Sequence, residues 1–542
     1  MSLLNEILTA RGLTGRERDA YLNPSYDAHH DPYLLPDMSL AVERIVKAHS
    51  SDEKVMIYGD YDIDGLTATT LLLDALEQFG FKSIDAFIPN RFVEGYGMTV
   101  DAIERIAKTG ATLIITVDCG SLSEKEIIRA GELGVDVIVT DHHNVAEQQP
   151  PAIAVINPKR TDHKYPFIDL AGVGVAFKLV QALQTRLEGL PIGQEKWLLD
   201  LVALGTVCDV VSLVDENRAN VYWGLKVLAK TKRPGLRALM AISNAEVDKL
   251  NARTLGFALG PRMNAAGRLE TAQIALDLLR AKNGSDALDR ARQLDELNKK
   301  RRGEQDEIMR EAVEQAKKYD DDSVLVLSGV GWNHGVVGIV AAKIMEAFNK
   351  PTFVLGENGK ESKGSARSYG DFSAAEAIRY ADEVVTKGGG HKLAAGVTLP
   401  TSSIDLFRKK VNEYYESQNL KNQTDLLVAR EDISAKLEHI TRELVTDISA
   451  MEPFGNGNVE PIIRIDGLLV SEKKQLGADR KHVKLTVVDS AGFRLQMIAF
   501  NAPEHFFVNE GEYISAWLHP IVNEWRGRVS VEGRLLRVEL AA

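Results

Sequence analysis

The sequence predicts an α/β fold made of two α/β domains, joined by a long helix and followed by a C-terminal β-barrel. Three observations predict it. Short apolar segments alternate with helical ones from about residue 41, a charged and proline-free helical stretch covers residues 285–319, and short alternating strands replace helices from about residue 460. Strands that alternate with single helices indicate a parallel, doubly wound sheet. Five short strands in one small unit favour an OB-fold barrel.

The same changes of pattern give the expected domain boundaries. We expect an N-terminal segment at 1–40, a first α/β domain at 41–215, a helical region with the connecting helix at 216–322, a second α/β domain at 323–415 and a barrel domain at 425–542.

Individual elements follow from hydrophobic periodicity and turn residues. In the first domain we expect strands at 55–60, 84–90, 112–118, 135–141 and 153–157, with helices at 66–80, 100–110 and 123–134. The second domain should begin with a strand at 323–329, a helix at 337–348 and a strand at 352–356. The barrel strands should lie at 461–470, 482–489, 493–500, 512–520 and 528–540.

Composition limits the class of protein. The chain has 542 residues, of which 44% are hydrophobic and 26% charged, as in soluble globular proteins with several domains. Its two cysteines, Cys119 and Cys208, exclude a disulfide scaffold, and no signal-peptide or membrane-spanning pattern is present, so we expect a cytoplasmic protein. The formal net charge of -12 argues against a uniformly basic surface but leaves room for a local basic groove.

Aspartates gather where predicted strands end. In VMIYGDYDIDG (55–65), Asp60, Asp62 and Asp64 occupy alternate positions, so their charges repel unless a cation or water separates them. Asp118 ends a second strand, and Asp141, His142 and His143 follow a third. The carboxyl ends of parallel strands meet at one edge of a sheet. Asp209 lies in the apolar segment LVALGTVCDVVSL, where burying a lone charge would be unfavourable.

These residue types predict a metal site. Carboxylate with imidazole suits Mn²⁺, carboxylate with water suits Mg²⁺, and several acids can hold the two ions that assist attack on phosphorus. One aspartate at a strand end is more often a helix N-cap, a role that would fit Asp64 alone, but four separate segments agree here. Ligation of zinc by Cys119 and Cys208 is the weaker alternative. We expect the pair His29-His30 to lie on the surface, without a function.

Motifs in this order resemble a known family. DYDIDG, VDCG, VTDHH and VCDVV are similar to the four motifs of the DHH phosphoesterase superfamily. A narrower resemblance, to the exonucleases of this superfamily that are specific for single-stranded DNA, rests on GPRMNAAGRL (260–269), SGVGWNHGVVGIVAAK (328–343), GSARS (364–368), GGGHKLAAG (388–396) and MEPFGNGNVEP (451–461). The resemblance covers nearly the whole chain and implies DHH, DHHA1 and OB-fold domains.

The resemblance also implies roles for matching residues. The implied metal ligands are Asp62, Asp64, Asp118, His142 and Asp209. Asp60 and Asp141 would be further ligands or would orient the ligands, and His143 would face the scissile phosphate. Arg268, Ser365 and Arg367 would hold a terminal 5′-phosphate; for Arg268 the alternative is a surface ion pair with Glu270.

Three further features have open interpretations. In GGGHKLAAG, Gly389, Gly390 and His391 would cradle a phosphate next to a helix that starts at Lys392; a flexible turn is the alternative. The run NKKRRG (298–303) is either a solvated helix face or a wall of a DNA channel. The barrel aromatics Phe493, Phe500, Trp517 and Trp525 are candidate base-stacking platforms, although most such aromatics fill a core.

The resemblance implies a function as a 5′→3′ exonuclease that uses Mn²⁺ or Mg²⁺, as two ions, to degrade single-stranded DNA to 5′-mononucleotides in recombination and repair. Implied partners are single-strand-binding protein and a helicase, with the chain itself a monomer. Two alternatives remain at this point. One is a DHH phosphodiesterase that acts on short oligonucleotides; the other is a non-catalytic, DNA-binding replication scaffold.

Overall fold

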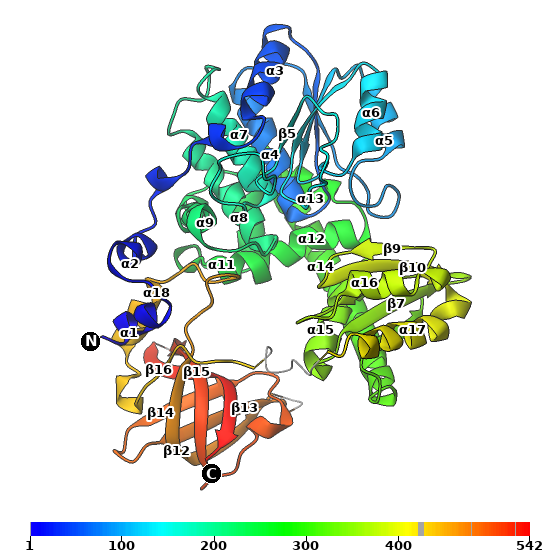
Figure 1. Ribbon diagram of the computed structural model, residues 1–542. Helices are drawn as coiled ribbons and strands as arrows, with labels where there is room; N and C mark the ends of the chain where they lie inside the picture. The colour runs from blue at the N-terminus through cyan, green and yellow to red at the C-terminus, as the bar shows by residue number, and fades with distance from the viewer. Residues whose placement is uncertain (1, 421–427, 478–479, 526, 542) are drawn as a thin grey trace.

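The computed structural model describes residues 2–420, 428–477, 480–525 and 527–541, apart from the side chain of Trp525. The predicted start of the barrel domain at residue 425 lies outside these residues. In Figure 1 the first α/β domain and its helices form the upper part, the second α/β domain lies at the right, and the barrel lies below. The domain boundaries stated above remain a prediction.

The first sheet is parallel, with strand order β2-β1-β3-β4-β5. Its strands are β1 (Val55–Tyr58), β2 (Ile84–Phe87), β3 (Leu113–Val117), β4 (Asp136–Thr140) and β5 (Ala154–Ile156). In register, Tyr58 lies beside Thr116, and Val117 lies beside Thr140. The chain therefore leaves β1, β3 and β4 at the same edge, as the alternating pattern predicts.

Helices cover both faces of this sheet. They are α3 (Met38–Ser50), α4 (Ile63–Gln78), α5 (Val100–Ala107), α6 (Glu124–Glu132) and α7 (Gly172–Leu183). Val55 and Ile57 share a core with α3, α4 and α7, whereas Met56 and Tyr58 share one with α5 and α6. This alternation along one short strand shows why β1 is apolar at every position.

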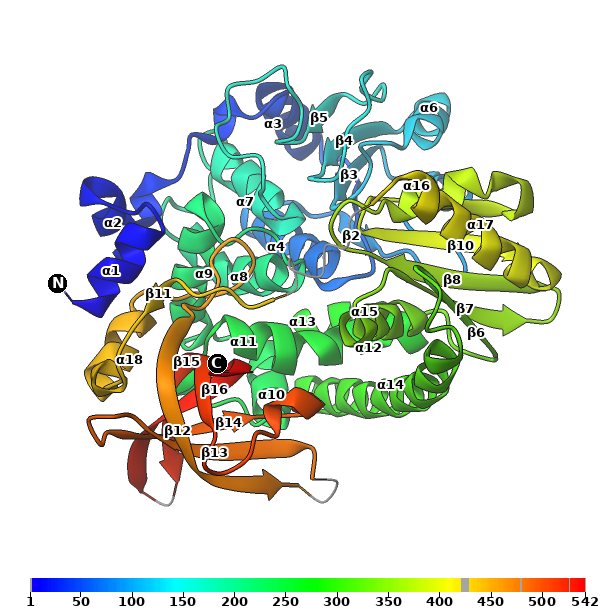
Figure 2. The ribbon, with the colours of Figure 1, turned by 60° about the horizontal axis from the view of Figure 1, so that its bottom comes forward.

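A helical region follows, and a long helix leads out of it. Its helices are α8 (Leu199–Cys208), α9 (Asp215–Leu228), α10 (Pro234–Ile242), α11 (Ala252–Thr254), α12 (Gly260–Leu269), α13 (Gln273–Leu279) and α14 (Gly284–Lys318). The first half of α14 packs on α10, α12 and α13, and its second half packs on α15 and β6 of the next domain. Figure 2 shows α14 running beneath the helical region and the second domain. The predicted connecting helix is therefore confirmed.

The second sheet is mixed, with order β6-β7-β8-β10-β9, and only the pair β6–β7 is parallel. Its elements are β6 (Leu325–Val330), α15 (Val337–Phe348), β7 (Thr352–Asn358), β8 (Glu361–Arg367), α16 (Ala374–Tyr380), β9 (Lys387–Gly390), β10 (Ala394–Pro400) and α17 (Ile404–Ser417). The prediction of a helix that starts at Lys392 is wrong. Residues 394–400 alternate between buried and less buried side chains, which is strand periodicity, and they pair with the glycine run as a hairpin.

The last domain is a closed barrel. It contains the short β11 (Ile433–Ser434) and the strands β12 (Ile463–Leu476), β13 (His482–Val488), β14 (Arg494–Ala499), β15 (Tyr513–Trp525) and β16 (Arg528–Leu540). Because β12 pairs with both β13 and β15, the five long strands close on themselves. The expected five-stranded OB-fold is confirmed.

The N-terminal helices connect the two ends of the chain. These are α1 (Leu3–Ala10) and α2 (Gly15–Leu22), and α1 packs on α18 (Arg442–Ser449) beside the barrel. Ile7 and Leu8 are fully buried in the barrel core together with Leu444 and Ile448. The first residues of the chain therefore complete its last domain.

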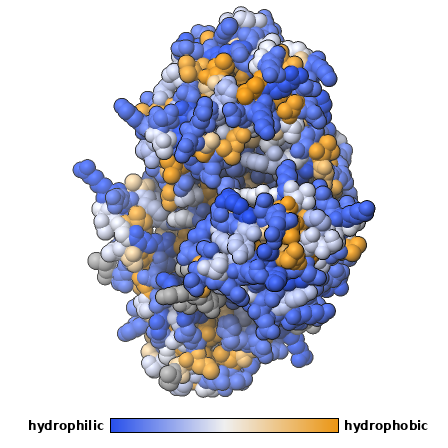
Figure 3. Space-filling view, turned by 45° about the vertical axis from the view of Figure 1, so that its right-hand side comes forward, coloured by the Kyte–Doolittle hydropathy of each residue, from blue (hydrophilic) through white to orange (hydrophobic). Residues whose placement is uncertain are grey.

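Among the described residues, every helix is too short or too polar to cross a bilayer. The face in Figure 3 is mainly hydrophilic, with apolar side chains in small groups.

Candidate functional site

The structure brings together the residues predicted from four separate segments. Asp60, Asp62 and Asp64 follow β1, Asp118 follows β3, the Asp141-His142-His143 run follows β4, and Asp209 directly follows α8. Their ligand atoms form three overlapping groups whose members all lie within 4.8 Å of one another: Asp60, Asp62 and Asp118; Asp64, His142 and Asp209; and Asp118, His142 and His143. The segments after β1, β3 and β4 meet here because the carboxyl ends of parallel strands lie at one edge of the sheet.

Asp62 and Asp64 have different local roles. Asp62 is the N-cap of α4, and its Oδ1 accepts the amides of Asp64 at 2.9 Å and Gly65 at 3.2 Å. The two oxygens of the buried Asp64 accept the first amides of α7, from Gly172 at 2.6 Å and Val173 at 2.8 Å. The N-cap role considered for Asp64 thus belongs to Asp62, and Asp64 joins α4 to α7.

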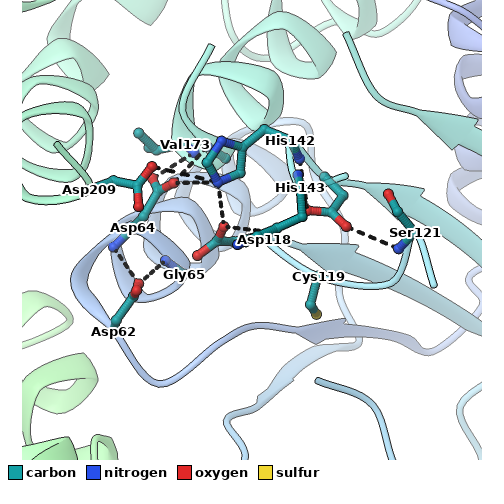
Figure 4. A network of polar contacts seen from close by, with 12 residues as sticks. Asp62, Asp64, Gly65, Asp118, Cys119, Ser121, His142, His143, Val173 and Asp209 are labelled. Atoms are coloured by element: carbon teal, nitrogen blue, oxygen red, sulfur yellow. Dashed lines mark hydrogen bonds and ion pairs between the residues drawn. The ribbon is translucent and has the colours of Figure 1, made fainter. Parts of the chain in front are cut away.

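His142 points its Nε2 atom into the carboxylates (Figure 4). This atom lies 3.0 Å from Asp118 Oδ1, 3.6 Å from Asp209 Oδ2 and 3.7 Å from Asp64 Oδ2. Burial, and then the nearby His143, lower the pKa of His142 to about 3. The imidazole is therefore neutral and offers a lone pair, as a metal ligand must.

The carboxylates are crowded and buried. Burial, and then the charge of Asp62, raise the pKa of Asp60 to about 8 and that of Asp64 to about 7. Burial and Asp64 raise the pKa of Asp209 to about 9, and burial and the same neighbour hold the pKa of Asp118 well above its usual range. So many acids in one buried place are unfavourable without a positive charge.

Unpartnered atoms point to the group that belongs there. Asp60 Oδ1, Asp118 Oδ1 and His142 Nε2 are buried and have no hydrogen-bond partner. Orphaned buried polar atoms are rare in proteins, and these are oxygen and nitrogen acceptors that converge on one space. The donor set, mainly carboxylate with imidazole, fits Mn²⁺ or Mg²⁺. Each residue present is of the type such an ion requires.

Two residues in or next to the cluster have a left-handed backbone. Asp118 has φ +60° and Val210, directly after Asp209, has φ +61°. A left-handed conformation at a β-branched residue is unusual and costs about 1–3 kcal/mol. Asp209 also lies at the C-terminal end of α8, where the helix dipole disfavours a negative charge. The backbone preference of valine and the helix dipole both oppose this arrangement, as is common at functional sites.

Asp141 and His143 form a pair beside the cluster. Asp141 Oδ1 accepts the amide of His142 at 2.7 Å and the Nδ1 of His143 lies 2.9 Å away, while Oδ2 accepts the amide of Ser121 at 2.9 Å. Although burial alone would raise the pKa of Asp141, the contacts with His143 lower it below its usual range. Burial alone would lower the pKa of His143, but the contact with Asp141 outweighs burial and raises this pKa above its usual value. His143 is one-third exposed, and the Tyr96 hydroxyl lies 3.1 Å from its ring nitrogens.

The cysteines lie apart from these ligands. Figure 4 shows Cys119 directed away from the carboxylates, and its Sγ lies 3.9 Å from the Tyr58 carbonyl oxygen. Cys208 Sγ lies 3.7 Å from the Leu255 carbonyl oxygen. None of the candidate metal groups found among the described residues includes a cysteine, which disfavours the zinc alternative.

A second part of the site is rich in arginine. Arg268, in the last turn of α12, donates its Nη1 to the Gly335 carbonyl at 2.9 Å, just before α15. Ser365 and Arg367 project from β8 toward the first turn of α15: a Cβ on Gly338 would lie 3.3 Å from Ser365 Oγ and from Arg367 Nη2. The structure thus brings the three predicted phosphate-binding residues to one domain interface.

Two more arginines belong to this group and were not predicted individually. Arg91 stacks on Tyr61 at 4.1 Å, and the buried Arg301 donates hydrogen bonds to the side chains of Gln305 and Asn298. Burial, and then Arg91, Arg301 and Arg367, lower the pKa of Arg268 to about 10. Within the described part of the chain, none of these four arginines forms an ion pair with an acid, and no Arg268–Glu270 pair is present. A cluster of cations without acidic partners favours the binding of an anion such as phosphate.

Sequence signals for the two arginines differ. The run NKKRRG contains Arg301, and the structure divides it: Lys299, Lys300 and Arg302 are exposed, while Arg301 is buried. The three exposed residues fit the solvated helix face, and a wall of a DNA channel stays a prediction. Arg91 lies in a loop without periodicity, so its role depends on tertiary packing alone.

The arginine group adjoins the metal cluster, and the second domain faces both. A Cβ on Gly267, next to Arg268, would lie 2.9 Å from the Tyr61 carbonyl oxygen, between Asp60 and Asp62. His391 Nδ1 lies 3.2 Å from Asn144 Nδ2, directly after His143. Gly389 and Gly390 form the exposed strand β9, and a Cβ on Gly390 (φ +144°) would lie 2.6 Å from the Ala394 carbonyl oxygen.

A cavity of about 690 Å³ opens beside the site. Its walls come from the end of α8, from α12 and α14, and from the linker before the barrel (residues 450–462, between α18 and β12), and they include Val210, Phe257, Arg268, Arg301 and Asn456. Of the barrel aromatics, Phe493 and Phe500 are 46% and 63% exposed, whereas Trp517 is buried between Arg464 and Arg537. The Trp525 side chain lies outside the described residues.

This fold and site define a class of protein, the DHH family. Its N-terminal domain matches residues 54–206, the DHHA1 domain matches residues 321–417, and the RecJ OB domain matches residues 431–536. The chain belongs to the RecJ family within that class, because it is 34% identical to the single-stranded-DNA-specific exonuclease RecJ of Escherichia coli over 523 residues, which cover 92% of this chain and 89% of that protein.

Further relatives agree. The chain is 37% identical to the single-stranded-DNA-specific exonuclease RecJ of Bacillus subtilis over 532 residues, which cover 97% of this chain but 66%, about two thirds, of that protein. It also resembles the crystal structure of RecJ from Thermus thermophilus in complex with Mn²⁺, with a TM-score of 0.81, 27% identity and coverage of 99% of this chain and 77% of that one.

Proposed function

We propose that the protein is a metal-dependent exonuclease that degrades single-stranded DNA from the 5′ end to 5′-mononucleotides. One observation carries this proposal: a buried carboxylate cluster with unpartnered acceptor atoms lies next to four arginines that lack acidic partners among the described residues. The first group suits divalent cations and the second suits a phosphate. Relatives at 34–37% identity are single-stranded-DNA-specific exonucleases.

Asp62, Asp64, Asp118, His142 and Asp209 would hold the metal ions. RecJ of Thermus thermophilus has been crystallised with Mn²⁺ and with Mg²⁺, so we assign the same two ions as alternatives, with two sites. When bound, the ions supply positive charge that lowers the pKa of a water molecule and offsets charge on the phosphate. Asp60, with its unpartnered Oδ1, is a further candidate ligand, whereas Asp141 acts through His143.

His143 would act on the scissile phosphate. Its contact with Asp141 favours the protonated ring, and its partial exposure lets it reach a substrate. A protonated imidazole can donate a hydrogen bond to a phosphate oxygen or to the departing 3′ oxygen. Asp141 accepts from the ring and fixes its orientation.

Arg268, Ser365 and Arg367 would bind the terminal 5′-phosphate, with Arg91 and Arg301 adding charge. Ser365 and Arg367 lie beside Gly338 in the first turn of α15, where the positive end of the helix dipole suits an anion. Gly389, Gly390 and His391 would approach the DNA backbone from the second domain. α12 contacts the loop that carries Asp60 and Asp62. A 5′ end held at Arg268 would therefore present a nearby phosphodiester to the metal cluster. Cleavage there would release a mononucleotide.

The rest of the strand would leave through the cavity toward the barrel. Exposed Phe493 and Phe500 could stack with bases there, while the buried Trp517 could not. We further propose that the protein acts as a cytoplasmic monomer in recombination and repair, together with single-strand-binding protein and a helicase.

A nuclease assay with Mn²⁺ tests the function. The substrate is one single strand labelled at either end, with and without a 5′-phosphate, compared with its duplex and an RNA copy. We expect mononucleotides from the 5′ end of single-stranded DNA only, and no product with Asp118→Ala. Cleavage confined to pieces of a few nucleotides would favour an oligonucleotide phosphodiesterase. Binding of the strand without cleavage would favour a scaffold.

A further inference from the structure

The backbone directly after Asp209 needs support from elsewhere. α8 ends at Cys208, and Val210 adopts φ +61° with a side chain that is 66% exposed. A β-branched residue avoids this conformation, and an exposed valine has little packing to hold it. The position of the Asp209 carboxylate therefore depends on whatever fixes the turn of residues 210–213.

A segment almost 250 residues later fixes that turn. Asn456 Nδ2 donates to the Val210 carbonyl oxygen at 3.0 Å, and the Leu213 amide donates to the Asn456 carbonyl oxygen at 2.7 Å. One residue thus binds both ends of the turn. From the other side, Asn217 Nδ2 donates to the Ser212 carbonyl at 3.0 Å, so the turn is held between α9 and the linker.

The fit between linker and turn is close. A Cβ on Gly457 (φ +72°) would lie 2.5 Å from Ser212 Oγ, and a Cβ on Gly455 would lie 2.7 Å from Leu213 Cδ1. Only glycine allows the linker to approach this near at both positions. The spacing G-N-G therefore places the amide side chain of Asn456 at the turn.

The linker is itself anchored from behind. Buried Arg218 donates to the carbonyl oxygens of Met451 at 2.9 Å and of Tyr21 at 3.1 Å. The Tyr21 hydroxyl donates to Asn458 Oδ1 at 2.7 Å. These contacts join α9, α2 and the linker residues on both sides of Asn456 into one support.

We propose that Asn456 is a positioning residue for the metal centre: it acts through the Val210 backbone to hold the Asp209 carboxylate among the other ligands. The linker into the barrel would then complete the metal site as well as connect the DNA-binding domain. This inference rests on the proposed metal-dependent function. Side chains that orient ligands without touching the metal commonly change its affinity when they are replaced.

The test compares four full-length proteins: wild type, Asn456→Ala, Asn456→Asp and Val459→Ala. Asn456→Asp keeps the size and the backbone contact with Leu213 but loses the donor to Val210. Val459 is an exposed neighbour in the same linker, and its carbonyl oxygen accepts from Arg11, away from the turn. Mn²⁺ binding is measured without DNA, by electron paramagnetic resonance of the free ion. Melting temperatures in chelator check folding.

We expect both Asn456 variants to bind Mn²⁺ about 10-fold more weakly. Their melting in chelator should match wild type, saturating Mn²⁺ should restore their nuclease rate, and Val459→Ala should bind Mn²⁺ normally. Unchanged Mn²⁺ affinity in both Asn456 variants, or an equal loss in Val459→Ala, overturns the inference. If the Asn456 variants bind Mn²⁺ weakly but wild type leaves single-stranded DNA uncut, the inference stands and the proposed function fails.

Discussion

The buried carboxylate of Asp64 accepts the backbone amide of Gly172 at 2.6 Å, so the first residue of α7 rests directly on the metal cluster. A Cβ on Gly172 would lie 2.9 Å from Asp64 Oδ2 and 2.8 Å from Asp118 Cβ. The helix can approach only because this residue has no side chain. The geometry of the cluster should therefore respond to any side chain added at this position.

Gly172→Ala should displace Asp64 or Asp118, because neither contact leaves room for a methyl group. We expect Mn²⁺ affinity to fall by about 10–100-fold, with nuclease activity falling in parallel at limiting metal. Isothermal titration with Mn²⁺ measures the first effect. Gly174→Ala is the matched control on the same helix, since its Cβ would make only an ordinary 3.4 Å contact with Leu170. Equal behaviour of the two variants would contradict the prediction.

Arg268→Ala should remove the preference for a 5′-phosphate. A charge-assisted hydrogen bond to phosphate contributes about 1.5–3 kcal/mol, which corresponds to roughly a 10–100-fold loss of rate on the phosphorylated strand. The rate on a strand with a 5′-hydroxyl should change much less. Arg262→Ala serves as control, because Arg262 lies on the same helix but pairs with Asp295 at 2.8 Å. A phosphate preference that survives in Arg268→Ala would refute the assigned pocket.

Asp118→Ala should stabilise the metal-free protein and abolish its stabilisation by metal. Without metal, its carboxylate is buried among like charges, so its removal should raise the melting temperature by a few degrees, at roughly 2–4 °C per kcal/mol. Mn²⁺ should raise the melting temperature of wild type but not of the variant, and chelator should cancel the rise. Scanning calorimetry with and without Mn²⁺ measures both effects. Asp85→Ala, at an exposed position of β2, should respond to Mn²⁺ as wild type does.

His29 should make the protein sensitive to acid. Both of its ring nitrogens are buried without a partner, and burial, followed by Lys178, lowers its pKa to about 3 from 6.5. Between these pH values the unfolded chain binds a proton that the folded chain does not, so stability falls as pH decreases below 6.5. The loss reaches about 2 kcal/mol at about pH 5.

His29→Phe should reduce this loss, because the ring that packs 4.4 Å from Tyr26 is kept and the titration is removed. The measurement is the melting temperature of wild type and variant from about pH 7.5 to about pH 5, the range in which an ordinary histidine titrates. His439→Phe, at a position that is 47% exposed, should leave the pH dependence unchanged. An identical slope for wild type and His29→Phe would rule out this role of His29.

Some of these features follow from sequence pattern and others do not. Period-two and period-3.6 hydrophobicity predicts the strands and helices, and the edge rule for parallel sheets brings Asp60, Asp118 and His142 together before any coordinates are known. Asp209 could be anticipated because a lone charge in an apolar helix needs a partner.

Contacts between distant segments could not be predicted in this way. Arg91 lies in a loop without periodicity, and Asn456 meets Val210 only in the folded chain. The prediction that His29 lies on the surface is wrong, because Tyr26 and Phe177 cover its ring. The helix expected at Lys392 is wrong because alternating residues of β10 decide that segment. Each of these outcomes depends on tertiary packing, which overrides local preference.

The burial of Ile7 and Leu8 in the barrel has a consequence for biosynthesis. These side chains are synthesised several hundred residues before the strands that cover them. At about 5–20 residues per second, translation separates the two events by roughly half a minute to two minutes. During that time the nascent chain carries an uncovered apolar helix, which a molecular chaperone would recognise. Completion of the barrel core therefore waits until β16 has been synthesised, even though the first domain can fold long before it.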